Sequence, residues 1–183
     1  MIHIVTPFRN DLNLGRAYND AFARIDDDDW LCIMDVDAMF LTSTQPRLLQ
    51  QYVDKYPDTG VFTCYTNRIS PLAKEQMIAG RMNESISILH HIHLAEQMEA
   101  EPVRASLLHR GECSGFLMMI SKRTWMETPA PEYLDKGGAI GVDTFWTRAI
   151  VASGKPIMRM DNLYIWHTYR LRQGIHNKQH LNA

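Results

Sequence analysis

Two aspartates separated by one residue follow an apolar run in the segment WLCIMDVDAMF. Residues 30–34 are continuously apolar, as in a strand that is covered on both faces, and the run ends at Asp35. We expect Asp35 and Asp37 to lie close together in a poorly solvated cleft. Two carboxylates in such a place repel each other unless a cation lies between them. Their oxygens suit Mg²⁺ or Mn²⁺. The pattern predicts a divalent metal site, with capping of the following turn as the alternative.

Four consecutive aspartates at positions 26–29 precede the same run and have a different interpretation. They lie between a predicted helix and the predicted strand, where four like charges are tolerated because water screens them. We expect all four to be solvated and to discourage association of the adjacent apolar strand with other chains.

The segments that would position these residues alternate between helical and strand patterns. Helices are expected where apolar residues recur with helical spacing, at residues 14–25, 46–56 and 142–152, with one or two polar helices within 72–100. Strands are expected at short apolar runs, residues 3–8, 30–34, 61–65, 116–120, 157–160 and 163–166. The alternation predicts a three-layer α/β/α domain with a mostly parallel sheet, in which ligands bind beyond the carboxyl ends of strands.

The composition limits the classes of function. A chain of 183 residues with a formal net charge of −2 can form a single domain with a sizeable core, but it has no overall positive field to hold a nucleic acid. The three cysteines are widely spaced without a CxxC motif, which favours a reducing compartment. No segment has the pattern of a secretion signal or a membrane span, so we expect a cytoplasmic protein with a small-molecule partner.

Three motifs, taken in order, resemble those of the GT-A glycosyltransferases, most closely of the family 2 type. IMDVDAMF is similar to the DxD motif that holds a divalent ion against a nucleotide diphosphate, and CSGFLMMISKRTW is similar to a later strand of the family. GGAIGVDTFWTRAIVASGKPIMRMDNLYIWH resembles the run in which a Gly-rich turn leads to an acidic residue that opens a helix, with a metal-binding histidine at the end. The resemblance covers most of residues 1–167 and implies a reduced GT-A domain that transfers a sugar from a nucleotide-diphosphate donor to an acceptor hydroxyl.

The resemblance also assigns roles to individual residues. Asp37 would bind the metal directly, Asp35 would contact the ribose or the metal shell, and His167 would be the third protein contact. An imidazole beside oxygen ligands favours Mn²⁺ over Mg²⁺. Asp143 matches the general base of inverting members, and the positive end of its predicted helix favours an ionised carboxylate. The alternatives are an ordinary interior histidine at position 167 and a helix cap at position 143.

The nucleotide sugar would be held by residues from several segments. The resemblance places the base and ribose near the residues that follow the first strand, and Arg9 could also reach a phosphate. The expected donor-binding residues are Thr6, Pro7, Arg9, Asp35, Val36, Ser114 and Gly115. The second strand and acidic base-contacting residue that are usual in the family have no counterpart here, so the resemblance does not predict the nucleotide base.

Two further segments have no assigned chemistry. Residues 69–110 form an insertion in which we expect an acceptor-side lobe. Its sequence LHHIH contains His90, His91 and His93, and on a helix the first and third share a face while the second points elsewhere. A solvated or interface helix is therefore favoured over a metal cluster. The basic tail, residues 168–183, is expected to be mobile and could fold over the donor.

Other classes of protein also place a DxD after a buried strand. A haloacid-dehalogenase-type phosphatase requires Gly-Thr after the second aspartate, where Ala38 and Met39 stand here. A calcium loop requires an oxygen ligand where Met39 falls. A non-catalytic nucleotide-sugar-binding module would keep Asp37 but would not need Asp143. Inversion at the sugar is implied by Asp143 and by the family that the sequence most resembles, and neither the acceptor nor the oligomeric state is indicated.

Overall fold

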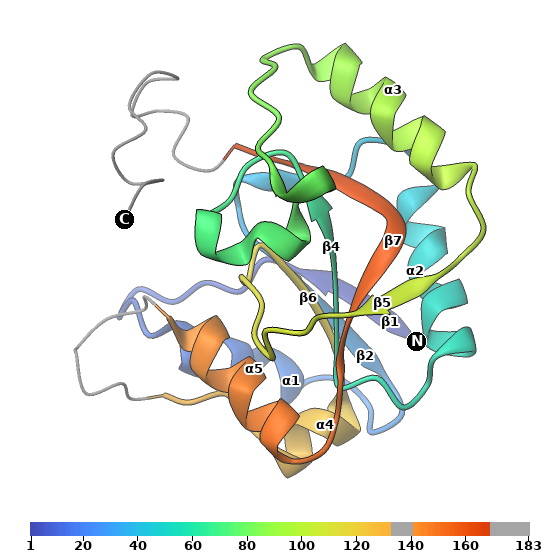
Figure 1. The fold of residues 1–183 in the computed structure, drawn as a ribbon. Coiled ribbons are helices and arrows are strands. Elements are labelled where there is room, and N and C mark those ends of the chain that lie inside the picture. Colours follow the sequence, from blue (N-terminus) through green and yellow to red (C-terminus); the bar gives the residue numbers. More distant parts are fainter. Residues whose placement is uncertain (133–140, 169–183) are drawn as a thin grey trace.

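A seven-stranded sheet lies at the centre of the described chain, which comprises residues 1–132 and 141–168 of a computed structural model (Figure 1). The strands are β1 (Ile2–Val5), β2 (Trp30–Met34), β3 (Ala38–Met39), β4 (Val61–Thr66), β5 (Ala105–Leu107), β6 (Leu117–Ser121) and β7 (Ile157–His167). Their order is β1-β2-β6-β4-β7-β3, and β5 also pairs with β7. The β1–β2 and β4–β7 pairs are parallel, and β6 joins them through antiparallel contacts with β2 and β4.

Five α-helices and two short 3₁₀ helices connect the strands of the described chain. They are α1 (Leu14–Phe22), α2 (Gln45–Lys55), η1 (Pro71–Gln76), η2 (Ile78–Gly80), α3 (Ile88–Glu99), α4 (Lys122–Glu127) and α5 (Val142–Ala152). Asn13 caps α1, because its side chain accepts a hydrogen bond from the backbone N–H of Arg16 at 2.9 Å. Within the described ranges, none of the helices has both the length and the apolar character needed to cross a lipid bilayer.

Side chains on the two faces of the sheet form two separate cores. Along β2, Cys32 packs in one core with Tyr52 of α2. The next residue, Ile33, packs in the other core with Phe22 of α1 and Trp146 of α5. Successive side chains of a strand point to opposite faces, so a strand with helices on both sides is apolar throughout. The apolar run of residues 30–34 is therefore explained by helices that cover both faces (Figure 1).

The structure confirms the α/β class and most of the predicted elements. The expected mostly parallel sheet is a mixed sheet, in which β1, β2, β4 and β7 share one direction and β3, β5 and β6 run the other way. The two strands predicted within residues 157–166 are one strand, because a register shift between Cys64 and Tyr65 of β4 accommodates the irregularity. Part of the expected helical region 72–100 is 3₁₀ helix and loop. The tail beyond Thr168 lies outside the described residues.

The expectation that residues 26–29 are all solvated is wrong for one of them. Asp26, Asp27 and Asp28 are exposed, as expected. The side chain of Asp29 is only 13% exposed, and its Oδ2 lies 2.7 Å from His3 Nε2. The parallel pairing of β1 with β2 explains the difference, because it brings His3 beside the start of β2.

Lys122 joins the C-terminal end of α1 to α4. Its side chain is buried, and its ammonium donates to the carbonyl oxygens of Phe22 at 2.6 Å and Ile25 at 3.3 Å. The ammonium also lies 4.8 Å from the centroid of the Trp125 ring. The last carbonyls of a helix lack intrahelical partners, and a cation placed there satisfies them. This contact therefore fixes α1 against the start of α4.

We expect Lys122→Met to lower the free energy of unfolding by about 1–3 kcal/mol, because two carbonyl oxygens lose a charged donor while the side-chain volume is kept. Urea denaturation at neutral pH measures the change. Arg123→Met is the matched control, since Arg123 pairs with Asp28 at 3.3 Å on the exposed surface. Such a pair contributes about 0–1 kcal/mol. Equal losses in the two variants would contradict the role given to Lys122.

Candidate functional site

The two aspartates after β2 lie on a tight turn that leads into β3. The backbone N–H of Asp35 donates to the carbonyl oxygen of Phe116, and the N–H of Ala38 donates to the carbonyl oxygen of Asp35, each at 3.0 Å. The second bond closes a four-residue turn at the carboxyl end of β2. Asp35 and Asp37 therefore lie where the sequence analysis places them. Val36, which stands between them, is exposed.

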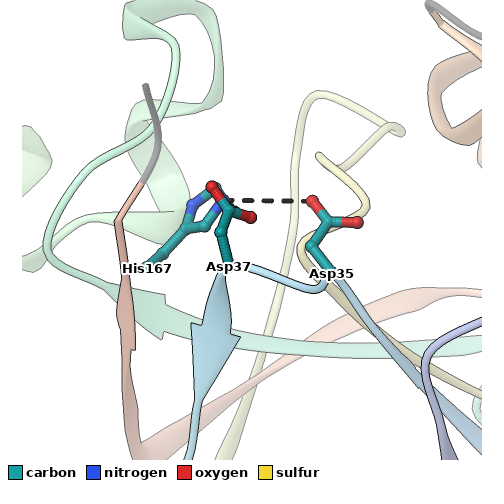
Figure 2. Close-up of side chains that lie close together, drawn as sticks. All are labelled: Asp35, Asp37 and His167. Carbon is teal, nitrogen blue, oxygen red and sulfur yellow. Dashed lines mark ion pairs between the residues drawn. The ribbon is translucent and has the colours of Figure 1, made fainter. Parts of the chain in front are cut away.

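β7 brings a histidine to the same turn. β3 pairs antiparallel with β7, with Ala38 opposite His167. His167 Nε2 lies 3.3 Å from Asp37 Oδ1 and 3.9 Å from Asp35 Oδ2 (Figure 2). One potential ligand atom from each of the three side chains lies within 4.8 Å of the others. The structure thus brings together the three residues to which the resemblance gives a metal role.

The imidazole of His167 is buried and oriented by its second nitrogen. Nδ1 lies 3.0 Å from the carbonyl oxygen of Arg68, and a carbonyl only accepts, so Nδ1 carries a proton. The backbone N–H of His167 donates to Asn67 Oδ1 at 2.8 Å, and its ring stacks on Phe116 with 5.3 Å between centroids. Metal-binding histidines commonly donate their other N–H to a backbone carbonyl in this way. Nε2 is therefore the nitrogen directed at the carboxylates.

The two carboxylates have different electrostatic surroundings. Partial burial raises the pKa of Asp35, the charge of His167 opposes the rise, and the charges of Asp37 and Asp143 add to it. The contact with His167 lowers the pKa of Asp37, and the hydroxyl of Thr168, which donates to Asp37 Oδ2 at 3.2 Å, lowers it further. Repulsion among acids in one cleft is relieved by a bound divalent cation.

Asp143 lies in the first turn of α5, and its carboxylate faces the backbone of Gly115. Oδ2 accepts a hydrogen bond from the N–H of Gly115 at 2.7 Å, and Oδ1 accepts one from the N–H of Thr144 at 2.8 Å. The adjacent Ser114 donates its backbone N–H to Gln76 Oε1 at 2.8 Å, which holds this segment in place. Burial raises the pKa of Asp143 in spite of its hydrogen bonds. Burial therefore has a larger effect than the backbone hydrogen bonds that favour the ionised carboxylate.

The expected donor residues of the N-terminal segment follow β1, which runs parallel to β2 with Val5 opposite Ile33. Thr6 and Pro7 follow β1, in the loop that leads to α1. Arg9 Nε donates to Asp11 Oδ1 at 3.1 Å, and its guanidinium also pairs with Asp20. The charge of Arg9 is thus matched by two carboxylates of its own segment. Its contact with a phosphate stays a prediction.

The three histidines of the insertion lie on α3 and do not form a metal cluster. His90 and His93 are exposed, whereas His91 is fully buried. His91 Nδ1 lies 2.6 Å from the hydroxyl of Tyr164, and Nε2 lies 2.9 Å from the carbonyl oxygen of Ser85. Because that carbonyl only accepts, Nε2 carries the proton and Nδ1 accepts from the tyrosine. One neutral imidazole satisfies both contacts, so His91 is a structural residue that fixes α3 on β7.

Tyr18 lies near the acidic residues, although its helical spacing in the sequence identifies it only as a core residue. Its side chain is 1% exposed, and its ring stacks on Trp146 with 5.6 Å between centroids. Burial raises the pKa of Tyr18, and the charges of Asp35 and Asp143 raise it further. The hydroxyl is therefore within electrostatic range of both carboxylates. Neither its place in the sequence nor its spacing on α1 indicates this position.

Comparisons with known proteins assign no family. No protein-family model matches the chain, and no curated protein matches it. Two carboxylates and one imidazole fit a hard divalent cation and leave coordination positions for water and phosphate oxygens. Among the described residues, these three side chains form the cluster suited to a metal.

Acidification tests the role of His91. Burial lowers the pKa of His91 below that of a free histidine, so in the folded protein it stays neutral where the unfolded chain takes up a proton. Above the pKa of His91 in the unfolded chain, both states are neutral and His91 costs no stability. As the pH drops below that pKa, protonation of the unfolded chain lowers the free energy of unfolding. We expect the loss of stability between about pH 8 and about pH 5.5 to be smaller in His91→Gln than in the wild type. Urea midpoints at both pH values measure it. His90→Gln, at an exposed position, should retain the wild-type pH dependence, and identical profiles for all three proteins would contradict the assignment.

The contact between Gly115 and Asp143 predicts that even one methyl group perturbs the site. A Cβ at position 115 would lie 3.0 Å from Asp143 Cβ and 3.3 Å from its Oδ2. We expect Gly115→Ala to lower the free energy of unfolding by about 1–3 kcal/mol, because the carboxylate must move from its hydrogen bond. Thermal and urea denaturation measure this. Ser114→Ala, which keeps the backbone bonds of the neighbouring residue, should change stability far less. Equal stability of Gly115→Ala and the wild type would show that the contact is loose.

Proposed function

We propose that this chain is a metal-dependent glycosyltransferase that moves a sugar from a nucleotide-diphosphate donor to an acceptor hydroxyl, with inversion at the anomeric carbon. The observation that carries the proposal is the meeting of Asp35, Asp37 and His167 at one end of the sheet. Asp143 supplies a further acid close enough to raise the pKa of Asp35. The order of the three motifs along the chain, and their resemblance to GT-A enzymes, favour this chemistry over other uses of a divalent cation.

The metal in this proposal is Mn²⁺, with Mg²⁺ as the alternative. Asp37 and His167 would bind it, and Asp35 would complete the protein ligands or contact the ribose. The support is the donor set itself, with two carboxylates beside an imidazole whose Nδ1 is already bonded to a backbone carbonyl. A cation held by so few protein ligands would leave positions for the phosphate oxygens of the donor and would supply positive charge to the departing diphosphate.

Asp143 acts in this proposal as the general base. As the acceptor oxygen attacks the anomeric carbon, its proton passes to the Asp143 carboxylate, and the bond between that carbon and the diphosphate oxygen breaks. A carboxyl group with a raised pKa is a stronger base than an ordinary aspartate, and burial raises the pKa of Asp143. The backbone N–H groups of Gly115 and Thr144 hold the carboxylate in one orientation while its remaining lone pairs stay free to accept the proton.

The acceptor would bind on the side of the insertion. An open groove of about 560 Å³ lies beside the ends of β4 and β7, and its lining includes Thr66, Arg81, Asn83, Leu94 and Tyr164. The chain leads directly from the groove to the metal centre. Asn67, the residue after Thr66, accepts a hydrogen bond from the backbone N–H of His167. Charged, amide and apolar side chains together suit a ligand with hydroxyl groups and an apolar face, as a saccharide has.

Two substitutions test the proposal on different steps. Asp37→Ala should abolish Mn²⁺ binding and transfer together, because the metal loses a direct ligand. Asp143→Asn should keep Mn²⁺ and donor binding but lower turnover by about 10²–10⁴-fold, the usual loss for a general base. Binding is measured by calorimetry, and turnover with a panel of nucleotide sugars in the presence of Mn²⁺. Asp28→Ala, at an exposed position, is the control.

Each result separates the candidate functions. Unchanged Mn²⁺ binding in Asp37→Ala would refute the metal site. Donor binding without any turnover in the wild type would favour a non-catalytic nucleotide-sugar-binding module. Loss of donor binding in Asp143→Asn would assign Asp143 to the donor instead of to proton transfer. Release of phosphate through an aspartyl-phosphate intermediate would favour the phosphatase class.

A further inference from the structure

Arg68 is a buried cation that has no acceptor for its charge in the described structure. The residue is 4% exposed, and residues 1–132 and 141–168 supply no hydrogen-bond or ion-pair partner for its guanidinium. Its Nε is completely enclosed by protein and unpaired. Arginine is almost never buried unless it is paired, because removing an uncompensated charge from water is costly. The folded chain therefore bears a cost at Arg68 that the described residues do not offset.

Within residues 1–132 and 141–168, the other buried or partly buried Lys and Arg side chains are paired, which makes Arg68 distinct among them. Lys122 bonds two helix carbonyls, and the guanidinium of Arg159 bonds Asp161 at 2.8 Å. Lys155, whose side chain is 23% exposed, pairs with Glu127 at 2.7 Å. Arg68 is thus not one member of a general basic surface, and the formal net charge of the chain is −2. A specific reason is needed for an unpaired guanidinium at this one position.

Arg68 lies on the segment that holds the metal-binding histidine. Its carbonyl oxygen accepts the Nδ1–H of His167 at 3.0 Å, and the preceding Asn67 accepts the backbone N–H of His167 at 2.8 Å. Asn67 is also fully buried, and its Nδ2 has no hydrogen-bond partner among the described residues. Two consecutive residues beside the end of β7 therefore carry buried N–H donors in need of acceptors.

A phosphoryl group has the chemistry that completes this position. The guanidinium is a planar fork of N–H donors that binds phosphate through two parallel hydrogen bonds, and it is always charged. A phosphate supplies several acceptor oxygens and the negative charge that Arg68 lacks. A divalent cation at the adjacent Asp35, Asp37 and His167 would itself keep positions for phosphate oxygens. Because the carbonyl oxygen of Arg68 bonds to His167, a phosphate oxygen bound to that cation would lie close to the Arg68 segment.

We propose that Arg68 binds a phosphoryl oxyanion beside the Asp35–Asp37–His167 centre. The assignment of this oxyanion to the diphosphate of the donor rests on the proposed function, whereas binding of the oxyanion itself does not. Because the neighbouring acids repel an anion until a cation neutralises them, Mn²⁺ and the oxyanion strengthen each other's binding. Arg68 is in this role a residue that binds the leaving group and stabilises its charge.

Calorimetric titration with inorganic pyrophosphate, with and without Mn²⁺, tests the proposal. We expect Arg68→Gln to weaken pyrophosphate binding at least about tenfold, as for loss of a charge-assisted fork, and to leave the affinity for Mn²⁺ alone unchanged. Arg68→Lys, which keeps the charge without the fork, should be intermediate. Arg47→Gln on the exposed side of α2 is the control and should bind like the wild type. Equal pyrophosphate affinity in the wild type and Arg68→Gln, or no binding by the wild type, would overturn the proposal.

The melting temperature gives a second readout. A binding role and a structural role for Arg68 predict opposite changes when the residue is replaced. Removal of an unpaired buried charge should raise the melting temperature of ligand-free Arg68→Met, and pyrophosphate should stabilise the wild type but not this variant. A lower melting temperature together with unchanged pyrophosphate binding would show that Arg68 is structural and solvated by interior water only. If Arg68→Met does not fold, the Arg68→Lys titration decides the question.

The design separates this proposal from the glycosyltransferase proposal. The glycosyltransferase proposal fails if Mn²⁺ binding is unchanged by Asp37→Ala, or if no nucleotide sugar supports transfer. The Arg68 proposal fails if pyrophosphate binding does not depend on Arg68. Acetate in place of pyrophosphate tests whether a carboxylate is held equally well, and equal binding of the two would refute the preference for a phosphoryl group.

Discussion

The short segment Gly115–Phe116, which leads into β6, makes the contacts on which the candidate centre depends. The amide of Gly115 holds Asp143, the carbonyl of Phe116 holds the backbone of Asp35, and the ring of Phe116 stacks on His167. β6 itself is antiparallel to both of its neighbours and joins the two parallel pairs of the sheet. Residues from three distant parts of the chain are thus positioned by one two-residue segment at the centre of the sheet.

This arrangement has an electrostatic cost that the fold does not relieve by itself. Asp35 and Asp143 are acids whose pKa values are raised by burial, and only Asp37 is favoured in its ionised form, by its contact with His167. Arg68 is a cation in the same region without an acceptor among the described residues. Acids whose ionised forms are disfavoured, and a buried cation without an acceptor, are typical of binding sites, where strain in the free protein is offset by the ligand.

The sequence predicts those parts of this structure that depend on local patterns. β2, α1, α2 and α5 are found because their apolar spacing is strong, and the position of Asp35 and Asp37 follows from the end of β2. β3 and β5 are only two and three residues long, too short for any periodicity, and they form because β7 offers a partner. The contacts of Arg68 and Tyr18 depend on tertiary packing alone. No local pattern distinguishes these two residues from others of their type.

The contacts made by Gly115–Phe116 are carried largely by a backbone amide and a backbone carbonyl, although position 115 itself must lack a side chain because a Cβ there would lie 3.0 Å from Asp143 Cβ. The geometry around the acids is therefore encoded by the path of the chain more than by the identity of its side chains. Substitutions can accumulate at most surrounding positions while the amide and the carbonyl stay in place. A centre built in this way can persist through evolutionary divergence that erases the similarity by which sequences are recognised as related.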